Sequence, residues 1–199
     1  TPDAEAAGKR ALRARALSLM TLLDPEAKLA KQQYADADNM TEQLSALAAL
    51  VAAGHADEAL AAFYDQWKHE KLVIDKWFMV QAVATPPEHA IEVVQKLSKH
   101  GDFEWKNPNR FRSLIGAFAS GNPAGFHDES GAGYEFVADW IITLDPHNPQ
   151  TTAGMCTVFS SMGQYDPARQ AKMKAALQRV QDTEGLSKNA SEIVGRILS

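Results

Sequence analysis

The sequence predicts an all-α protein of stacked antiparallel helical hairpins, arranged like a HEAT or armadillo superhelix. Apolar residues recur with a helical period through most of the 199 residues, and no run alternates over the length of a strand. Proline repeatedly follows Asp, Asn or Thr, where proline suits the first helical position and the preceding residue can cap. Predicted loops of about two to five residues then force neighbouring helices to run antiparallel.

In the first half of the chain, a few start and stop signals place the helices in turn. Asp24-Pro25 starts the second helix, and Gly54 ends the third. Thr85 to Glu88 has the spacing of a capping box and starts the sixth helix, which Gly101 ends. A single apolar face supports the fourth helix: Ala59, Leu60, Phe63, Tyr64 and Trp67. Helices are predicted at about 3–23, 25–36, 41–53, 56–70, 73–84 and 86–100.

The second half carries the same kind of punctuation. Asn107-Pro108, Asn148-Pro149 and Asp166-Pro167 each start a helix. Glycine marks helix ends at Gly121, Gly163 and Gly185. The ninth helix is supported by one apolar face, formed by Met155, Val158, Phe159 and Met162. Helices are predicted at about 108–119, 133–144, 149–162, 166–183 and 188–198.

Residues 122–132, NPAGFHDESGA, interrupt this pattern. Small and flexible residues surround a polar centre there, which predicts a short turn of helix followed by a surface loop. Residues 1–199 are numerous enough for a single helical-repeat domain with its own core. No repeat of fixed period accompanies the helices, so the hairpin architecture rests on helix lengths, and an irregular helical bundle is the alternative.

Composition excludes several classes of function. The net charge of −5 and the dispersed basic residues argue against a nucleic-acid partner. No segment reaches the roughly 18 consecutive apolar residues of a membrane helix, and the N-terminus has no hydrophobic signal-peptide region. The single cysteine, Cys156, allows no internal disulfide, which fits a reducing compartment. Because Cys156 lies in an apolar run, a buried and inert thiol is favoured over a nucleophile.

Two histidine motifs suggest chemistry but lack the residues that it needs. The zinc motif HExxH requires two histidines one helical turn apart, whereas the stretch from His69 has Val73 in the second position. His127-Asp128-Glu129 has the ligand types for a metal or for proton transfer. No partner cluster accompanies it, so a solvated loop is the favoured interpretation. We therefore predict no catalytic residue and no metal ligand in this chain.

Arg110 and Arg112 are two residues apart on a predicted helix, so their side chains point about 200° apart and cannot face one ligand. One of them can lie at the Asn107 turn while the other faces a cavity or a partner. Salt bridges between helices or simple solvation are the alternative roles. The aromatic residues between Phe63 and Phe78 have spacings that favour packing between helices over a ligand box.

Several of these strings resemble the C-terminal domain of bacterial aminopeptidase N, a zinc metallopeptidase. FYDQWKHEKLVIDKWF, residues 63–78, is similar to the corresponding segment of that family nearly position for position. NPNRFRSLIGAFASGNPAGFHDESGAGYEFVADWI, residues 107–141, is similar in the same way. The resemblance continues through NPQ at 148–150 and YDPARQAKMKAAL at 165–177, whereas residues 1–60 match only in helical character.

The resemblance implies a domain without chemistry of its own. The family's C-terminal domain is a HEAT-like or armadillo-like superhelix that packs over a thermolysin-like catalytic domain and closes the active site into a chamber. The parent enzyme removes N-terminal amino acids from peptides in the cytoplasm, and its HExxH helix and zinc lie upstream. Residues 1–199 then form the last part of a larger C-terminal domain and hold no cofactor. Their partners are the upstream catalytic domain and, through the parent, peptide substrates.

The resemblance also implies three residues that line the substrate chamber. Gln150, in the NPQ segment, occupies the position that faces the far side of the substrate. Gly154 stands where relatives of the bacterial type have an arginine that reaches into the chamber, so that charge is missing here. Arg112 matches the second arginine of the NPNRxR block and is expected at a domain interface or in the chamber wall.

A free-standing helical-repeat module that binds a protein or peptide is the alternative function. An upstream reading frame with an HExxH motif would distinguish the two. An independent hydrolase that uses His69 or His127 is a third and weaker alternative, and it would require peptidase activity from the chain alone. If the chain caps a catalytic domain, its docking face is apolar, and the isolated chain is expected to self-associate.

Overall fold

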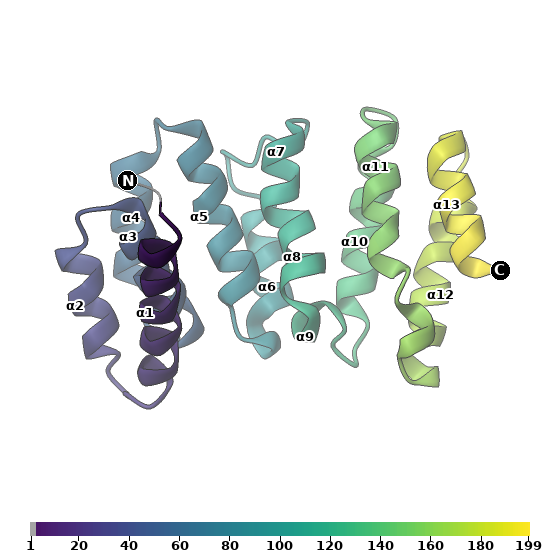
Figure 1. The fold of residues 1–199 in the computed structure, drawn as a ribbon. Helices are drawn as coiled ribbons and strands as arrows, with labels where there is room; N and C mark the ends of the chain where they lie inside the picture. The colour runs from purple at the N-terminus through teal and green to yellow at the C-terminus, as the bar shows by residue number, and fades with distance from the viewer. Residues whose placement is uncertain (1–2) are drawn as a thin grey trace. The chain divides into compact units, whose positions relative to one another are not determined.

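The computed structural model describes residues 3–199, which contain helices and turns but no strand (Figure 1). Helices make up 75% of the structure, so the prediction of an all-α fold is confirmed. No helix in this range combines the length and apolar composition needed to cross a membrane. The chain divides into two compact units, one ending at Pro86 and the other running from Pro87 to Ser199.

The first unit is organised around its third helix. It contains α1 (Ala4–Leu22), α2 (Lys28–Asp36), α3 (Met40–Ala52), α4 (Asp57–Trp67) and α5 (Lys71–Ala84). Helix α3 packs against α1, α2 and α5, and α4 packs against α5. The core of this unit is accordingly rich in α3 and α5 side chains, which include the fully buried Leu47, Leu50, Ile74 and Phe78.

The aromatic residues of α4 and α5 pack between helices, as predicted. Phe63 and Phe78 are fully buried. The rings of Tyr64 and Trp77 lie 5.1 Å apart, and Trp77 Nε1 donates a hydrogen bond of 3.0 Å to the Leu60 carbonyl. The indole therefore has a partner for its one polar atom and joins α5 to α4.

The predicted helix start at Asp24-Pro25 is wrong by three residues, because Asp24 caps from a distance. Its carboxylate accepts hydrogen bonds from the backbone N–H groups of Glu26 and Lys28, at 3.1 and 2.6 Å. Ala27 lies between them with a left-handed φ of 52°, and α2 begins only at Lys28. The proline thus opens a capped turn in front of the helix.

The second unit contains α6 (Pro87–Leu97), α7 (Pro108–Phe111), a π-helical turn (Arg112–Gly116), α8 (Ala117–Gly121) and α9 (Pro123–Phe126). It continues with α10 (Ala132–Leu144), α11 (Pro149–Cys156), α12 (Pro167–Gln181) and α13 (Lys188–Leu198). Helix α10 packs against α11 and α12, α11 packs against α13, and α6 packs against α9.

The Asx-Pro start signals of this unit are confirmed in atomic detail. In each case the side-chain oxygen of the residue before proline accepts a backbone hydrogen bond from the first turn. The capping residues are Asn107, Asn122, Asn148 and Asp166.

Two predicted helices differ from the structure in their interior. The helix expected at 108–119 is divided by the π-helical turn at Arg112–Gly116. The helix expected at 149–162 ends at Cys156 and is followed by two 3₁₀ turns, Thr157–Phe159 and Met162–Gln164. The local apolar period is similar in α-, π- and 3₁₀-helices over one turn, so periodicity alone does not distinguish them.

The short turn of helix predicted after residue 122 is present as α9, but the end of this turn and His127 after it are buried rather than part of a surface loop. Phe126 is fully buried, and its ring meets those of Phe118, Tyr134 and Phe159 at 6.0, 5.2 and 5.6 Å. His127 beside it is also buried. The polar composition of this segment predicted exposure, but the single aromatic residue Phe126 packs in the core and holds the adjacent backbone there.

Gly133 is required by the close approach of this segment to α10. A Cβ at this position would lie 2.6 Å from the Phe126 carbonyl oxygen. We expect Gly133→Ala to lower the free energy of unfolding by about 1–3 kcal/mol, since a packed backbone must move. Thermal unfolding followed by circular dichroism measures this.

Gly195 in α13 supplies the matched control, because a Cβ there meets nothing within 4 Å. Gly195→Ala should leave stability unchanged or raise it by up to about 1 kcal/mol, since alanine favours a helix. Equal melting temperatures for the two variants would contradict the close packing at Gly133.

Candidate functional site

The three residues that the sequence singled out as chamber-lining, Arg112, Gln150 and Gly154, line one pocket of about 370 Å³ in the second unit. One wall is the π-helical turn with the last turn of α8, and the other is α11 with the 3₁₀ turn after it. The remaining lining residues are Gly116, Ser120, Thr151, Met155, Thr157 and Val158.

Helix α11 presents Gln150 and Gly154 to the pocket because they are four residues apart and share one helical face. Both are exposed, whereas Thr152 and Cys156 on the opposite face are buried. The Asn148 cap fixes where this helix begins, with its Oδ1 accepting a bond of 3.0 Å from the backbone N–H of Thr151. A Cβ at Gly154 would meet nothing within 4 Å, so the pocket has open space at that point.

The π-helical turn aims Arg112 at the pocket while the residues that follow it stay in the core. Ser113, Leu114 and Ile115 are all buried, but Arg112 is exposed. Its Nη2 lies 3.4 Å from Thr151 Oγ1, which is a long hydrogen bond between the two walls. A wider helical turn changes the direction of the side chains around it, and such turns often occur at functional sites.

Arg110 takes the opposite direction, as the 200° separation predicted. It is buried, and its guanidinium donates to the backbone carbonyl of Asp102. The first arginine of the NPNRxR block therefore holds the loop before α7, and the second is left for the pocket.

Arg112 is the one charged residue among those that line this pocket. Across residues 3–199, no carboxylate oxygen comes within 4.0 Å of its guanidinium nitrogens. The pocket therefore combines an unpaired positive charge with neutral hydrogen-bonding groups from Ser120, Gln150 and Thr151.

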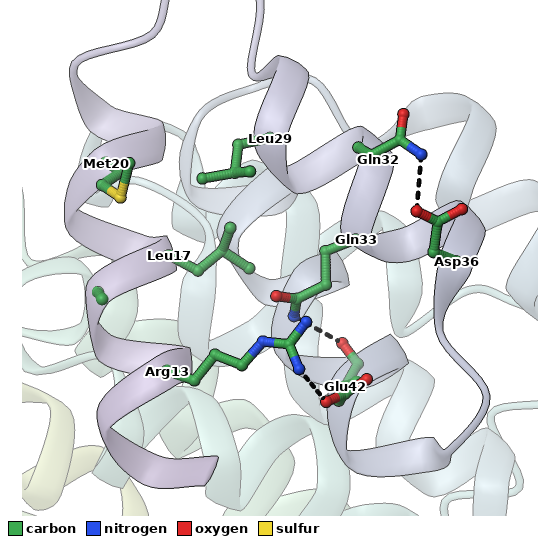
Figure 2. A pocket seen from close by; sticks show the side chains of 9 residues that line it. Arg13, Leu17, Met20, Leu29, Gln32, Gln33, Asp36 and Glu42 are labelled. Atoms are coloured by element: carbon green, nitrogen blue, oxygen red, sulfur yellow. Dashed lines mark hydrogen bonds and ion pairs between the residues drawn. The ribbon is translucent and has the colours of Figure 1, made fainter. Parts of the chain in front are cut away.

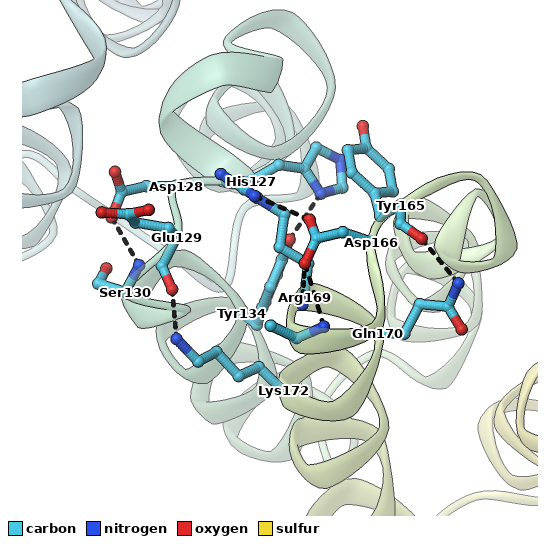
Figure 3. Close-up of polar contacts among 11 residues, drawn as sticks. His127, Asp128, Glu129, Ser130, Tyr134, Tyr165, Asp166, Arg169, Gln170 and Lys172 are labelled. Carbon is cyan, nitrogen blue, oxygen red and sulfur yellow. Dashed lines mark hydrogen bonds and ion pairs between the residues drawn. The ribbon is translucent and has the colours of Figure 1, made fainter.

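His127 belongs to a separate polar cluster and corrects the interpretation of that motif as a solvated loop (Figure 3). Its Nδ1 lies 2.9 Å from the Tyr134 hydroxyl, and its ring stacks on Tyr165 with the centroids 3.9 Å apart. Its backbone carbonyl accepts a hydrogen bond of 2.7 Å from Arg169 Nε. Burial, and secondly the positive charge of Arg169, lower the pKa of His127. Burial likewise raises the pKa of Tyr134 to about 12.

These contacts predict that the His127 site is stable at neutral pH and weakened by acid. The folded-state pKa of His127 lies below its unfolded value of about 6.5, so the unfolded chain binds the proton more readily. The stabilisation is present above about pH 6.5 and is lost as the pH falls towards the folded-state pKa. Thermal unfolding between pH 7.5 and pH 5 measures this loss.

His127→Gln is the comparison that isolates the imidazole, because glutamine does not titrate and can still hydrogen-bond to Tyr134. We expect the melting temperature of this variant to fall less steeply with acidification than that of the parent chain. The carboxylates of Asp128 and Asp166 close to Arg169 are common to both proteins and cancel in the comparison. Identical pH profiles would show that His127 does not titrate in this range.

The other sequence motifs take structural positions. His69 and Glu70 lie in the turn between α4 and α5 rather than inside a helix, where a zinc motif must be. Cys156 is fully buried, as predicted, and burial raises the pKa of its thiol to about 12. Within residues 3–199 there is no group of three or more His, Cys, Asp or Glu side chains that could hold a metal ion.

A second pocket, of about 280 Å³, lies between α1, α2 and α3 in the first unit (Figure 2). Arg13 forms an ion pair of 2.5 Å with Glu42, whose backbone carbonyl accepts a hydrogen bond of 3.2 Å from Gln33. The side-chain amide of Gln32 donates a hydrogen bond to the Asp36 carboxylate. Because these polar groups pair with one another, this pocket offers little for a polar ligand to recognise.

Comparison with known proteins identifies a family model and several relatives that match most or all of the chain. The family model described as "Domain of unknown function (DUF3458_C) ARM repeats" matches residues 1–199. The chain is 43% identical over 204 residues to aminopeptidase N of Caulobacter vibrioides, covering 98% of this chain and 23% of that protein. It is 40% identical over 173 residues to aminopeptidase N of Escherichia coli, covering 86% of this chain and 20% of that protein.

A solved structure agrees with these sequences. The crystal structure of Legionella pneumophila aminopeptidase A in complex with aspartic acid superposes with a TM-score of 0.90 at 36% identity. The match covers 98% of this chain and 23% of that one, so the chain spans about a fifth to a quarter of the length of its relatives. The resemblance to the C-terminal region of aminopeptidase N is confirmed, and the ARM-repeat description favours helical hairpins over an irregular bundle.

Proposed function

The chain belongs to the DUF3458_C family of ARM-repeat domains, and from this we propose that it is a non-catalytic wall of the substrate chamber in a longer zinc aminopeptidase. In this proposal residues 1–199 act as one helical-repeat domain, the last part of a larger C-terminal domain. The upstream catalytic domain is its partner, and cytoplasmic peptides are the substrates that reach it.

The observation that carries the proposal is the meeting of Arg112, Gln150 and Gly154 in one pocket. The family resemblance implies these residues from segments almost 40 positions apart in the chain. Residues that share a wall are expected to meet in this way, whereas scattered surface residues are not.

The chemistry is assigned to the upstream part of the protein. A catalytic zinc needs three protein ligands and an open position for water. Among the described residues no group of three or more His, Cys, Asp or Glu side chains could hold a metal ion, and in this proposal the zinc is bound upstream. A chamber wall contributes to specificity by excluding water and by contacting the substrate beyond the reacting atoms.

The test compares the full-length protein with the isolated chain. The full-length protein should release N-terminal amino acids from peptides and should lose this activity when zinc is chelated. The isolated chain should show no peptidase activity, with or without added zinc. Because the structure of the Legionella relative contains aspartic acid, peptides that begin with Asp should be included among the peptides tested. If the protein encoded by the natural gene lacked an upstream HExxH region, this would support the alternative, a free-standing peptide-binding module.

The proposal also predicts that the isolated chain self-associates. Four leucines at the outward face and end of α1, Leu12, Leu19, Leu22 and Leu23, are between 51% and 86% exposed. Such a cluster on a soluble protein marks a surface that is normally covered. Sedimentation should show a concentration-dependent increase in mass, and Leu12→Gln with Leu19→Gln should reduce it. Arg10→Gln, on the same helix, is the control, and a chain that remains monomeric at high concentration would contradict the prediction.

A further inference from the structure

The first unit carries an apolar groove between α3 and α5, separate from the two pockets described above. Its volume is about 460 Å³. Met40, Leu44 and Ala48 line it from α3, and Met79 and Val83 line it from α5. These two helices pack against each other, so both walls of the groove belong to one compact unit.

Helix α5 carries two apolar faces, although a helix at a protein surface usually carries one. Ile74 and Phe78 lie on the inner face and are buried in the core. Leu72, Met79 and Val83 lie on the opposite face, because their spacings return to the same side of a helix. Their side chains are 71%, 39% and 40% exposed. The outer face of α5 therefore forms an apolar stripe that the core of this unit does not use.

Exposed apolar side chains are concentrated in the first unit. Among residues 3–199, every large apolar side chain that is exposed lies between Leu12 and Val83. The second unit, from Pro87 to Ser199, exposes none within the same range. Single exposed apolar residues are normal on any surface and would be shared between the units. A concentration of them in one unit instead marks a surface that contacts a partner.

Lys76 is the one charged residue among those that line the groove. It lies between Leu72 and Met79 on the outer face of α5 and is half-buried. Within residues 3–199 it forms no ion pair. The hydroxyl of Ser45, which also lines the groove, already donates to the Glu42 carbonyl at 3.0 Å. A complementary occupant of the groove therefore offers apolar side chains and a carboxylate.

On the basis of the function proposed above, we propose that this groove docks an amphipathic helix from the upstream part of the same protein. The apolar face of that helix packs on Met79 and Val83, and a carboxylate at its edge pairs with Lys76. A groove between two helices is a common receptor for a third helix. Helices α3 and α5 have 13 and 14 residues, and at 1.5 Å per residue they are about 20 Å long, which matches a partner of roughly three to four turns.

The occupant is assigned to the same protein because most of the length of the relatives lies outside this structure. The chain spans 20–23% of the aminopeptidase N proteins that it matches. A segment of the same polypeptide has a high effective concentration, so it binds to a groove that is too small to hold a free partner. A second copy is less suitable. A two-fold contact through this groove would bring two Lys76 ammonium groups together without a carboxylate.

The experiment replaces Val83 by the photoreactive amino acid p-benzoylphenylalanine in the full-length protein. After irradiation and digestion, mass spectrometry identifies the peptide that is joined to position 83. We expect a cross-link within one molecule, to a peptide upstream of residue 1 that has apolar residues at helical spacing and an acidic residue. The same probe at Ala62, which is exposed on α4 and does not line the groove, is the control and should not label that peptide.

Substitution of the charge tests the ion pair. Lys76→Glu places a carboxylate against that of the docked helix, so the yield of the cross-link from position 83 should fall by about fivefold or more, whereas Lys76→Arg should preserve it. Lys31→Glu makes the same change at an exposed position of α2 that does not line the groove, and it is the control. Equal circular dichroism spectra of these variants exclude unfolding as the cause.

Three results would overturn the docking site while the proposed function stands. The first is an active aminopeptidase in which the probe at position 83 labels a second copy or an added peptide. The second is one in which it labels no protein segment. The third is an equal loss of yield in Lys76→Glu and Lys31→Glu. An upstream cross-link in a protein without aminopeptidase activity would instead support the docking site and overturn the proposed function.

Discussion

Asp145→Ala should destabilise the second unit by about 3 kcal/mol, because two hydrogen bonds to a buried carboxylate are lost together. Asp145 is 3% exposed and lies at the end of α10. Its Oδ2 accepts a bond of 2.6 Å from the backbone N–H of Ser187, and its Oδ1 accepts one of 2.7 Å from the Ser187 hydroxyl. Ser187 is in turn the N-cap of α13.

The effect should be concentrated at the C-terminal helix. Without Asp145 the Ser187 hydroxyl is no longer oriented towards the N–H of Ala190, which it caps at 3.3 Å. We expect faster hydrogen exchange and earlier proteolysis in α13 than in α10. Asp145→Asn retains one acceptor and should lose about half as much stability.

Asp139→Ala is the matched control within the same helix. Asp139 pairs with Arg179 at 2.6 Å, but its side chain is 65% exposed. An exposed ion pair contributes at most about 1 kcal/mol. If Asp139→Ala and Asp145→Ala lowered stability equally, the buried link from α10 to α13 would not be important for this unit.

The parts of the fold that follow from local chemistry were predictable from the sequence. Asn107, Asn148 and Asp166 cap helices within three residues of themselves, so neighbouring residues contain all the information that is needed. Asp24 departs from this because its carboxylate reaches forward to Lys28 and leaves a turn between them.

The parts that depend on distant residues were not predictable in this way. Phe126 is buried by rings from α8, α10 and the 3₁₀ turn, none of which is adjacent to it in sequence. The π-helical turn at Arg112 likewise depends on keeping Ser113 to Ile115 in the core. The helical period does not reveal that Arg112 and Gln150 line the same pocket. Only the resemblance to a known family indicated that both residues line the substrate chamber.

Gly154→Arg should change the peptide selectivity of the full-length protein by about tenfold, in favour of substrates that offer a hydrogen-bond acceptor. The new side chain meets no atom within 4 Å at its Cβ, so the helix should accept it without strain. It would supply the charge that the family resemblance implies for this position and place a second guanidinium near Arg112. Gln150→Ala, one turn earlier, should also alter selectivity because it removes an amide from the same pocket.

Both variants should leave the zinc chemistry intact, since neither residue reaches the metal in this proposal. The measurement is kcat/KM over peptides that differ only in the residues after the scissile bond. Gly195→Arg is the control, because Gly195 is also a helical glycine with open space but does not line the pocket. Suppose that Gly154→Arg and Gln150→Ala changed every kcat/KM by less than about twofold, which is roughly 0.4 kcal/mol of transition-state stabilisation. The start of α11 would then not contact the substrate, and the pocket would have to be explained by the interface with the upstream domain.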